Sequence, residues 1–218
     1  MSSRRVTLTF DNGPSPGVTE RVLDVLDEHD LSATFFVCGK NLADPHAREL
    51  IFDARQRGHW IGNHTMTHST SLGEQSDPDT LRYEIGAVQE MLGSAAHAER
   101  FFRPRGNGGV LDRRLLSRNA LTYLADNRYS VVLWTSVPRD WEDPDGWPDR
   151  AMTDIGATEH TVLVVHDIPS GAMRQLPAFI ERVRDDGAEF VQDFPDSCVP
   201  MRRGALLAEI DHLIAADG

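Results

Sequence analysis

Four side chains that could form a hydrolytic site stand out in the sequence: Asp11, His64, His68 and His166. A carboxylate can accept a proton from water, and an imidazole, which titrates near physiological pH, can donate one to a leaving group. Imidazole nitrogens also bind divalent metals such as zinc, which in catalytic sites keeps one coordination position open for water. If the four side chains converge, they predict metal-assisted cleavage of an amide bond.

Each of these residues also has a simpler interpretation. His64 and His68 are separated as two ligands on one helical turn or compact loop would be, but surface and capping histidines show the same spacing. Asp11 lies in Asp11-Asn12-Gly13-Pro14, a composition typical of turns. A histidine that ends an apolar strand, as His166 does, is often structural. The catalytic interpretation therefore depends on whether the fold brings the residues together.

The elements that would position them follow a βα pattern. Short apolar runs rich in β-branched and aromatic residues alternate with segments of helical periodicity, which predicts about seven βα units around a parallel sheet. The predicted strands cover 6–10, 33–37, 60–62, 101–102, 131–135, 162–165 and 189–192. No low-complexity linker interrupts the series, so we expect one domain, residues 1–218, folded as an α/β barrel; a doubly wound open sheet is the alternative.

The predicted helices lie between these strands. The first is expected to begin with Ser15 as its cap and Pro16 at its first position. A later helix is expected to begin at Asp112 and to continue through Leu124, and a closing helix is expected over 206–213. Because such helices pack outside a parallel barrel, the carboxyl ends of all strands should meet at one rim.

Ligands of α/β folds bind at the carboxyl ends of the strands, so the residues that follow each strand decide the chemistry. Ionisable or metal-binding side chains follow most of the predicted strands: Asp11 and Asn12, His64 and His68, Arg103, Asp140 and Trp141, and His166 and Asp167. The topology thus predicts that these residues share one rim.

At this point the chain resembles the polysaccharide deacetylase family, carbohydrate esterase family 4, which includes chitooligosaccharide and peptidoglycan deacetylases. Five segments carry the resemblance, in the family's order: residues 9–14, 63–69, 102–106, 134–141 and 164–167. Together they span nearly the whole chain. The resemblance implies a deformed (β/α)7 barrel, a divalent metal, and hydrolysis of an N- or O-acetyl group.

Carried over by position, the resemblance implies an acid-base pair with supporting residues. Asp11 matches the general base, and Arg103 matches the arginine that orients it. His166 matches the general acid, and Asp140 matches the aspartate that holds this histidine.

The resemblance also implies a metal site and an acetyl pocket. His64 and His68 match two metal ligands, and Asn12 stands at the position of the third. The backbone N–H of Gly106 matches the donor that helps to hold the oxyanion, and Trp141 matches the wall of the acetyl pocket.

Three positions depart from the family's pattern: Asn12 replaces an aspartate, Gly106 replaces a tyrosine, and Val137 stands where an aspartate is common. An amide oxygen can coordinate a metal but brings no negative charge, so we expect a weakly held cation, zinc first, with cobalt, nickel or manganese as options. Gly106 keeps the backbone donor but loses a substrate wall, and it makes the loop more flexible.

Composition excludes other functions. The net charge of −12 opposes nonspecific nucleic-acid binding, which needs Lys and Arg to neutralise phosphates. The sequence contains no apolar run long enough for a membrane span and no export signal, so we expect a cytoplasmic protein without a membrane partner. Cys38 and Cys198 lack metal-type spacing, which predicts two buried, reduced thiols. The oligomeric state is left open.

The sequence therefore supports one leading function and two alternatives. The leading hypothesis is metal-dependent deacetylation of an N-acetylated sugar or a related small molecule, with a small-molecule or oligosaccharide substrate. A metal-independent amidohydrolase of a cyclic imide or ureide is the first alternative. The second is a protein that binds a glycan or metabolite without turnover, although such a protein would have no need of the acid-base residues Asp11, Arg103, Asp140 and His166.

Overall fold

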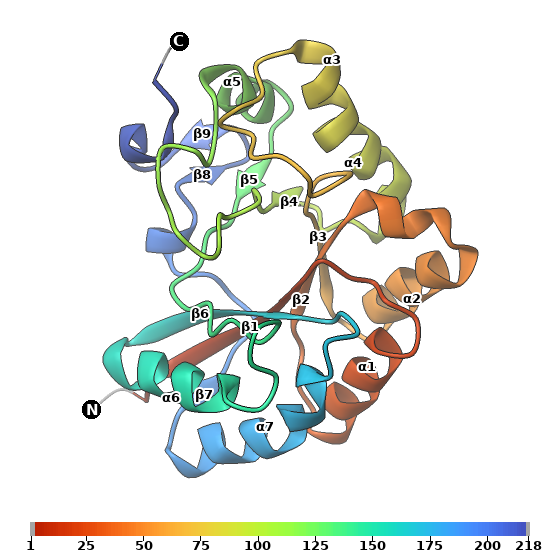
Figure 1. The fold of residues 1–218 in the computed structure, drawn as a ribbon, viewed down its shortest axis with the longest axis vertical. Helices are drawn as coiled ribbons and strands as arrows, with labels where there is room; N and C mark the ends of the chain where they lie inside the picture. Colours follow the sequence, from red (N-terminus) through yellow and green to blue (C-terminus); the bar gives the residue numbers. More distant parts are fainter. Residues whose placement is uncertain (1–2, 217–218) are drawn as a thin grey trace.

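The structure is a computed structural model and describes residues 3–216. Its strands curve around a common centre, and its helices lie on the outside (Figure 1). The strands are β1 (Arg5–Asp11), β2 (Thr34–Val37), β3 (Trp60–Asn63), β4 (Phe101–Phe102), β5 (Ser130–Val131), β6 (His160–His166), β7 (Glu189–Phe190), β8 (Met201–Arg202) and β9 (Ala205–Leu206).

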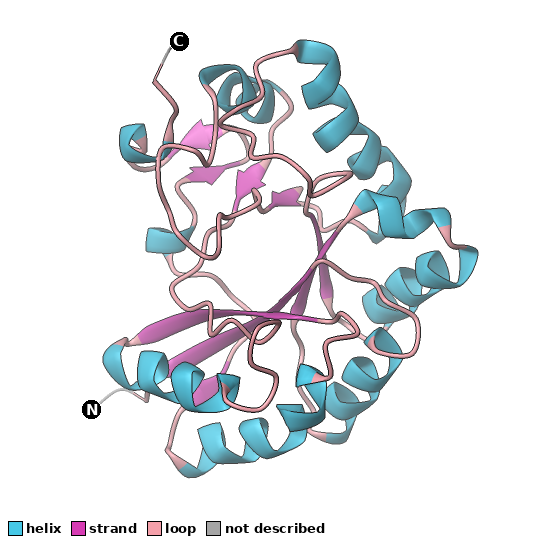
Figure 2. Ribbon diagram, in the orientation of Figure 1, coloured by secondary structure: helices cyan, strands magenta, loops and turns pink. Residues whose placement is uncertain are grey.

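The helices and strands alternate along most of the chain (Figure 2). The α-helices are α1 (Thr19–Glu28), α2 (Pro45–Gln56), α3 (Pro78–Leu81), α4 (Ala87–Leu92), α5 (Arg118–Asp126), α6 (Trp147–Ala157) and α7 (Leu176–Asp185). Short 3-10 turns cover Gly39–Ala43, Gly93–Ala95, Ala172–Gln175, Asp196–Cys198 and Asp211–Leu213, and a π turn, Arg82–Gly86, joins α3 to α4.

The sheet confirms the predicted deformed (β/α) barrel rather than the doubly wound alternative. Its order is β6-β1-β2-β3-β4-β5-β8-β9, with β7 also paired to β1. Pairing is parallel from β6 to β5, and β8 and β9 add antiparallel strands beside β5. The segment after β5 forms a parallel bridge between Ser136 and Leu163 of β6, which brings the two ends of the parallel series together.

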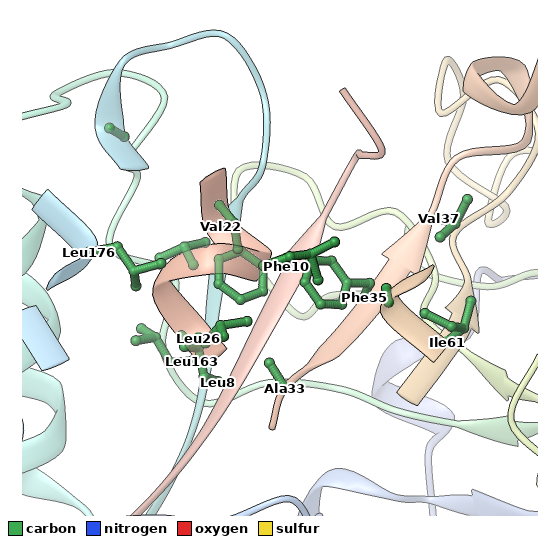
Figure 3. Packing of buried hydrophobic residues seen from close by; sticks show 14 of the residues in the cluster. Leu8, Phe10, Val22, Leu26, Ala33, Phe35, Val37, Ile61, Leu163 and Leu176 are labelled. Atoms are coloured by element: carbon green, nitrogen blue, oxygen red, sulfur yellow. The ribbon is translucent and has the colours of Figure 1, made fainter. Parts of the chain in front are cut away.

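Alternation along the strands separates the core from the site, because successive side chains of a strand point to opposite faces. Val6, Leu8 and Phe10 of β1 join the buried cluster beneath the helices. Figure 3 shows Phe10 between Phe35 of β2 and the helix α1. Thr7, Thr9 and Asp11, the intervening residues of β1, are therefore directed toward the barrel's interior. In the same way, Leu163 and Val165 of β6 join the outer cluster, so His166 shares the inner face.

Two predicted helix starts were wrong. The first helix starts at Thr19 instead of near Ser15, because Gly17 has a φ of 82°, which a right-handed helix does not allow. The helix predicted from Asp112 starts only at Arg118, with Ser117 as its cap. Residues 112–115 form one turn, in which the Leu115 N–H donates to the Asp112 carbonyl oxygen at 3.0 Å, and Leu116 then forms bridges to Leu72 and Ile214 instead of continuing a helix.

The predicted closing helix over 206–213 is also wrong. The chain instead forms the β8–β9 hairpin, whose turn residues Arg203 and Gly204 have φ values of 49° and 85°. Positive φ at both central residues is the geometry that matches the twist of two antiparallel strands. Leu206 and Leu207, expected to be buried, are both 53% exposed.

Candidate active site

Asp11 and His166 lie beside each other at the carboxyl ends of two neighbouring strands. In the parallel pairing of β1 with β6, Asp11 is the register partner of His166. Both side chains are directed to the inner face by the alternation described above, and both residues are buried. The sheet register thus places a carboxylate and an imidazole at the same rim.

Arg103 holds the carboxylate of Asp11 from below. It follows β4, is wholly buried, and its Nη1 donates to Asp11 Oδ1 at 2.8 Å. The same nitrogen donates to Thr9 Oγ1 at 2.7 Å, and the guanidinium lies 4.0 Å from the ring centroid of Phe36. These contacts fix the plane of the guanidinium, and with it the direction of the Asp11 carboxylate.

Asp140 holds His166 in the corresponding way. His166 Nδ1 lies 2.7 Å from Asp140 Oδ1, and the His166 backbone N–H donates to Asp140 Oδ2 at 3.0 Å. Burial lowers the pKa of His166, but the hydrogen bond to Asp140 and the negative charges of Asp140 and Asp11 outweigh it, so the net shift is upward. Because Nδ1 is occupied by Asp140, Nε2 is the nitrogen left to exchange protons with a ligand.

His64 and His68 lie on a compact loop after β3, with ring centroids 4.7 Å apart. The loop places Thr65 and His68 in left-handed backbone conformations, with φ values of 67° and 53°. His64 Nδ1 donates to the Arg103 carbonyl oxygen at 2.7 Å, so Nε2 keeps its lone pair and lies 3.5 Å from Asp11 Oδ2.

Burial keeps both imidazoles neutral. It lowers the pKa of His64 and lowers that of His68 to about 2, with the neighbouring positive charge of Arg105 adding to the second shift. Neutral imidazoles are the form that binds metals.

Asn12 stands beside this loop with a φ of 72°, a conformation that Asn tolerates better than most residues. Its amide Oδ1 faces the Cys38 thiol at 3.8 Å, and its backbone oxygen accepts from Asn41 Nδ2 at 2.7 Å. Within residues 3–216, no three His, Cys, Asp or Glu side chains form a metal-binding group. The two imidazoles and the Asn12 amide line the same cavity.

A cavity of about 360 Å³ joins these residues at the rim. Of the predicted site residues, those that line it are Asp11, Asn12, His64, His68, Gly106, Trp141 and His166. Arg103 and Asp140 are fully buried and support Asp11 and His166 from outside the cavity lining. The volume falls in the range of cavities that hold small molecules.

Two tryptophans wall the cavity. The Trp141 ring meets the His166 ring edge to face, with centroids 4.8 Å apart. Trp134 lies so close to Gly106 that a Cβ built there would meet its indole at 2.6 Å. The Trp134 Nε1 donates to the Gly109 oxygen at 2.8 Å, which ties the 106–109 loop to the wall. The space expected for a tyrosine at position 106 therefore belongs to Trp134.

Sequence reasoning gave no individual role to three residues that line this cavity: Trp134, Arg105 and Arg139. Arg105 and Trp134 lie inside two of the five segments that carry the family resemblance, and this position was a signal that could have identified them. Asp167 is buried beneath Gly13 and accepts from Thr19 Oγ1 at 2.6 Å; burial raises its pKa to about 7. It supports the turn that carries Asn12, a contact that its position after β6 did not by itself predict.

The sequence model of the family described as polysaccharide deacetylase matches residues 1–125. The chain is 35% identical to a chitooligosaccharide deacetylase of Bradyrhizobium sp. (strain ANU 289) over 182 residues, which cover 79% of this chain and 75% of that enzyme. The chain belongs to the polysaccharide deacetylase family.

Other members of the polysaccharide deacetylase family show the same likeness. The chain is 25% identical to the peptidoglycan-N-acetylglucosamine deacetylase PgdA of Listeria monocytogenes serotype 1/2a over 87% of this chain, but it spans only 38% of that longer protein. A solved structure described as T48 deacetylase with substrate superposes with a TM-score of 0.72 at 26% identity, covering 99% of this chain and 97% of that one.

Membership of the polysaccharide deacetylase family makes the chain a hydrolase of the deacetylase class. The relatives favour deacetylation over the cyclic-imide hydrolysis and the non-catalytic binding that the sequence left open.

Both cysteines are buried and free, as predicted. Among the helices of residues 3–216, none combines the length and apolar character that a membrane crossing requires.

Proposed function

We propose that the chain removes the acetyl group from an N-acetylated sugar, with Asp11 and His166 as its acid-base pair. One observation carries the proposal: the two residues are register partners at the rim, and each has its own buried partner, Arg103 or Asp140. A protein that only bound a glycan would have no use for two separately supported titratable groups.

The residues divide the reaction between them. Asp11 accepts a proton from the water that attacks the acetyl carbonyl, and Arg103 directs its carboxylate and stabilises its charge. His166 donates a proton from Nε2 to the nitrogen as the C–N bond breaks, and Asp140 stabilises its protonated form. Asp11 gains one proton and His166 loses one as acetate and the free amine form. Proton exchange with solvent then restores both residues for the next turnover. We assign the stabilisation of the oxyanion to the backbone N–H of Gly106, which lines the same cavity.

His64, His68 and Asn12 would hold a divalent cation, with zinc as the first candidate. The supporting observations are the two neutral imidazoles and the lone pair that the His64 tautomer leaves on Nε2. When bound, the cation supplies Lewis-acid polarisation of the acetyl carbonyl. Because the Asn12 amide carries no negative charge, we expect the cation to bind more weakly than it would with an aspartate at position 12.

The direct test measures acetate release from N-acetylglucosamine oligomers with zinc or cobalt supplied. We expect activity in the unmodified chain and a loss of about a hundredfold or more in Asp11→Asn and in His166→Gln. Asp185→Asn and His212→Gln make the same chemical changes at exposed positions and should keep full activity. Absence of acetate release from every N-acetyl sugar in the presence of metal would contradict the proposal.

A further inference from the structure

Arg105 is a cation without a partner at the edge of the cavity. It follows Arg103 in the loop after β4, lines the cavity, and is half-buried. Its Nε is buried with no hydrogen-bond partner, and no ion pair involves it within residues 3–216. A buried donor left unpaired is costly in free energy unless a ligand satisfies it.

The other charges of the cavity wall cancel in pairs. Asp11 is neutralised by Arg103 at 2.8 Å, and Arg139 by Glu142 at 2.7 Å. Once these pairs are set aside, Arg105 is the uncompensated charge among the described residues of the wall. An acidic chain of net charge −12 thus presents a positive charge inside its cavity.

Two further residues of the cavity wall are uncharged. Asn12 and Val137 both line the cavity. An aspartate at either position would attract Arg105 or repel an anionic ligand across a cavity of this size. Because both residues are uncharged, neither adds a negative charge to the cavity that Arg105 lines.

We propose that the preferred substrate of this chain carries a carboxylate or phosphate beside its N-acetyl group, and that Arg105 binds this anion. The inference rests on the proposed function and specifies its substrate class. A guanidinium presents a planar set of N–H donors that matches either oxyanion with two parallel hydrogen bonds. Trp134 and Trp141 offer apolar walls for the sugar ring, so Arg105 selects the substituent rather than the ring.

The test compares ligands that share the N-acetylated ring and differ in charge. N-acetylglucosamine is the neutral ligand, N-acetylmuramic acid carries a carboxylate, and N-acetylglucosamine 6-phosphate carries a phosphate. Binding is measured by calorimetry on metal-depleted protein and again with zinc present, since a bound cation would also attract anions. We expect one or both anionic ligands to bind about tenfold more tightly than the neutral one in both states.

Arg105→Gln should remove this preference while changing the affinity for N-acetylglucosamine by less than about threefold. Arg105→Lys keeps the positive charge without the planar donors and should keep part of the preference for anionic ligands. Arg113→Gln makes the same chemical change at an exposed position outside the cavity and should leave the preference for anionic ligands unchanged. Circular dichroism of each variant verifies that it is folded.

Equal affinity for all three ligands, or a preference that persists in Arg105→Gln, would overturn the inference. The proposed function is judged separately by acetate release. Acetate release from neutral oligomers together with equal affinity for all ligands would contradict the inference but not the proposed function. Arg105-dependent binding of the anionic ligands without any acetate release would contradict the proposed function but not the anion site.

Discussion

The buried ion pair between Arg103 and Asp11 allows a quantitative test of how the site is built. Arg103 Nη1 and Asp11 Oδ1 are 2.8 Å apart, and the two side chains are 0% and 6% exposed. At an effective dielectric constant of about 20, unit charges at this separation attract by about 6 kcal/mol. Desolvation offsets much of this attraction, but removing one partner leaves the other charge buried, which costs about 3–5 kcal/mol. We therefore expect Arg103→Met to lower the free energy of unfolding by about that amount.

A double-mutant cycle isolates the pair from the other hydrogen bonds of Arg103. Asp11→Asn is measured alone and together with Arg103→Met by urea unfolding at neutral pH, followed by circular dichroism. Because the double variant contains no unpaired charge, it should be more stable than the sum of the single changes predicts, with a coupling of about 1–3 kcal/mol.

The matched control is the ion pair of Arg82 with Asp79, at 3.0 Å but 71% and 83% exposed. The cycle of Arg82→Met with Asp79→Asn should give a coupling below about 1 kcal/mol, because water screens the charges. If the buried coupling is no larger than the exposed one, the electrostatic argument for Arg103 fails.

Two further predictions concern the acid and the metal. Asp140→Asn removes a negative charge that helps to raise the pKa of His166. Acetate release falls with rising pH as this acid loses its proton, so in the variant the fall should begin at lower pH. A kcat/KM profile from about pH 5 to 9 measures the shift, and an unmoved alkaline limb would argue against the assignment. Asn12→Asp adds a negative charge beside His64 and His68 in a conformation that Asp also tolerates, so zinc should bind about tenfold or more tightly in competition with a chelator, and equal affinities would contradict a ligand role for this position.

The parallel strands of the fold were predictable because their signal is local. The apolar run of β6 and the alternation of β1 mark strands by composition and periodicity alone. The caps Asp44 and Asp77 of α2 and α3 are local signals of the same kind, since the side chain of each accepts a hydrogen bond from the backbone of the first helical turn. The closing segment was not predictable in this way, because pairing of β8 with β5 overrode the helical spacing of Leu206 to Leu213.

The sequence by itself determined the chemistry available to this protein. Asp11, His64, His68 and His166 were identifiable by residue type and by their position after predicted strands, and these positions follow from topology because all parallel strands end at one rim. The supporting roles of Arg103 and Asp140 came only from the resemblance, because residue pattern alone does not show which distant side chains pair with Asp11 and His166.

Only the tertiary structure decided which hydrogen bonds these groups form and what surrounds them. Long-range packing places the Arg103 carbonyl on His64 Nδ1, fills the space beside Gly106 with Trp134, and leaves Arg105 without a counter-ion. Such properties depend on distances between segments far apart in the chain, and no local pattern encodes them. The sequence therefore supplies the candidate side chains, whereas the fold sets their hydrogen-bond partners, their charges and the shape of the cavity that they share.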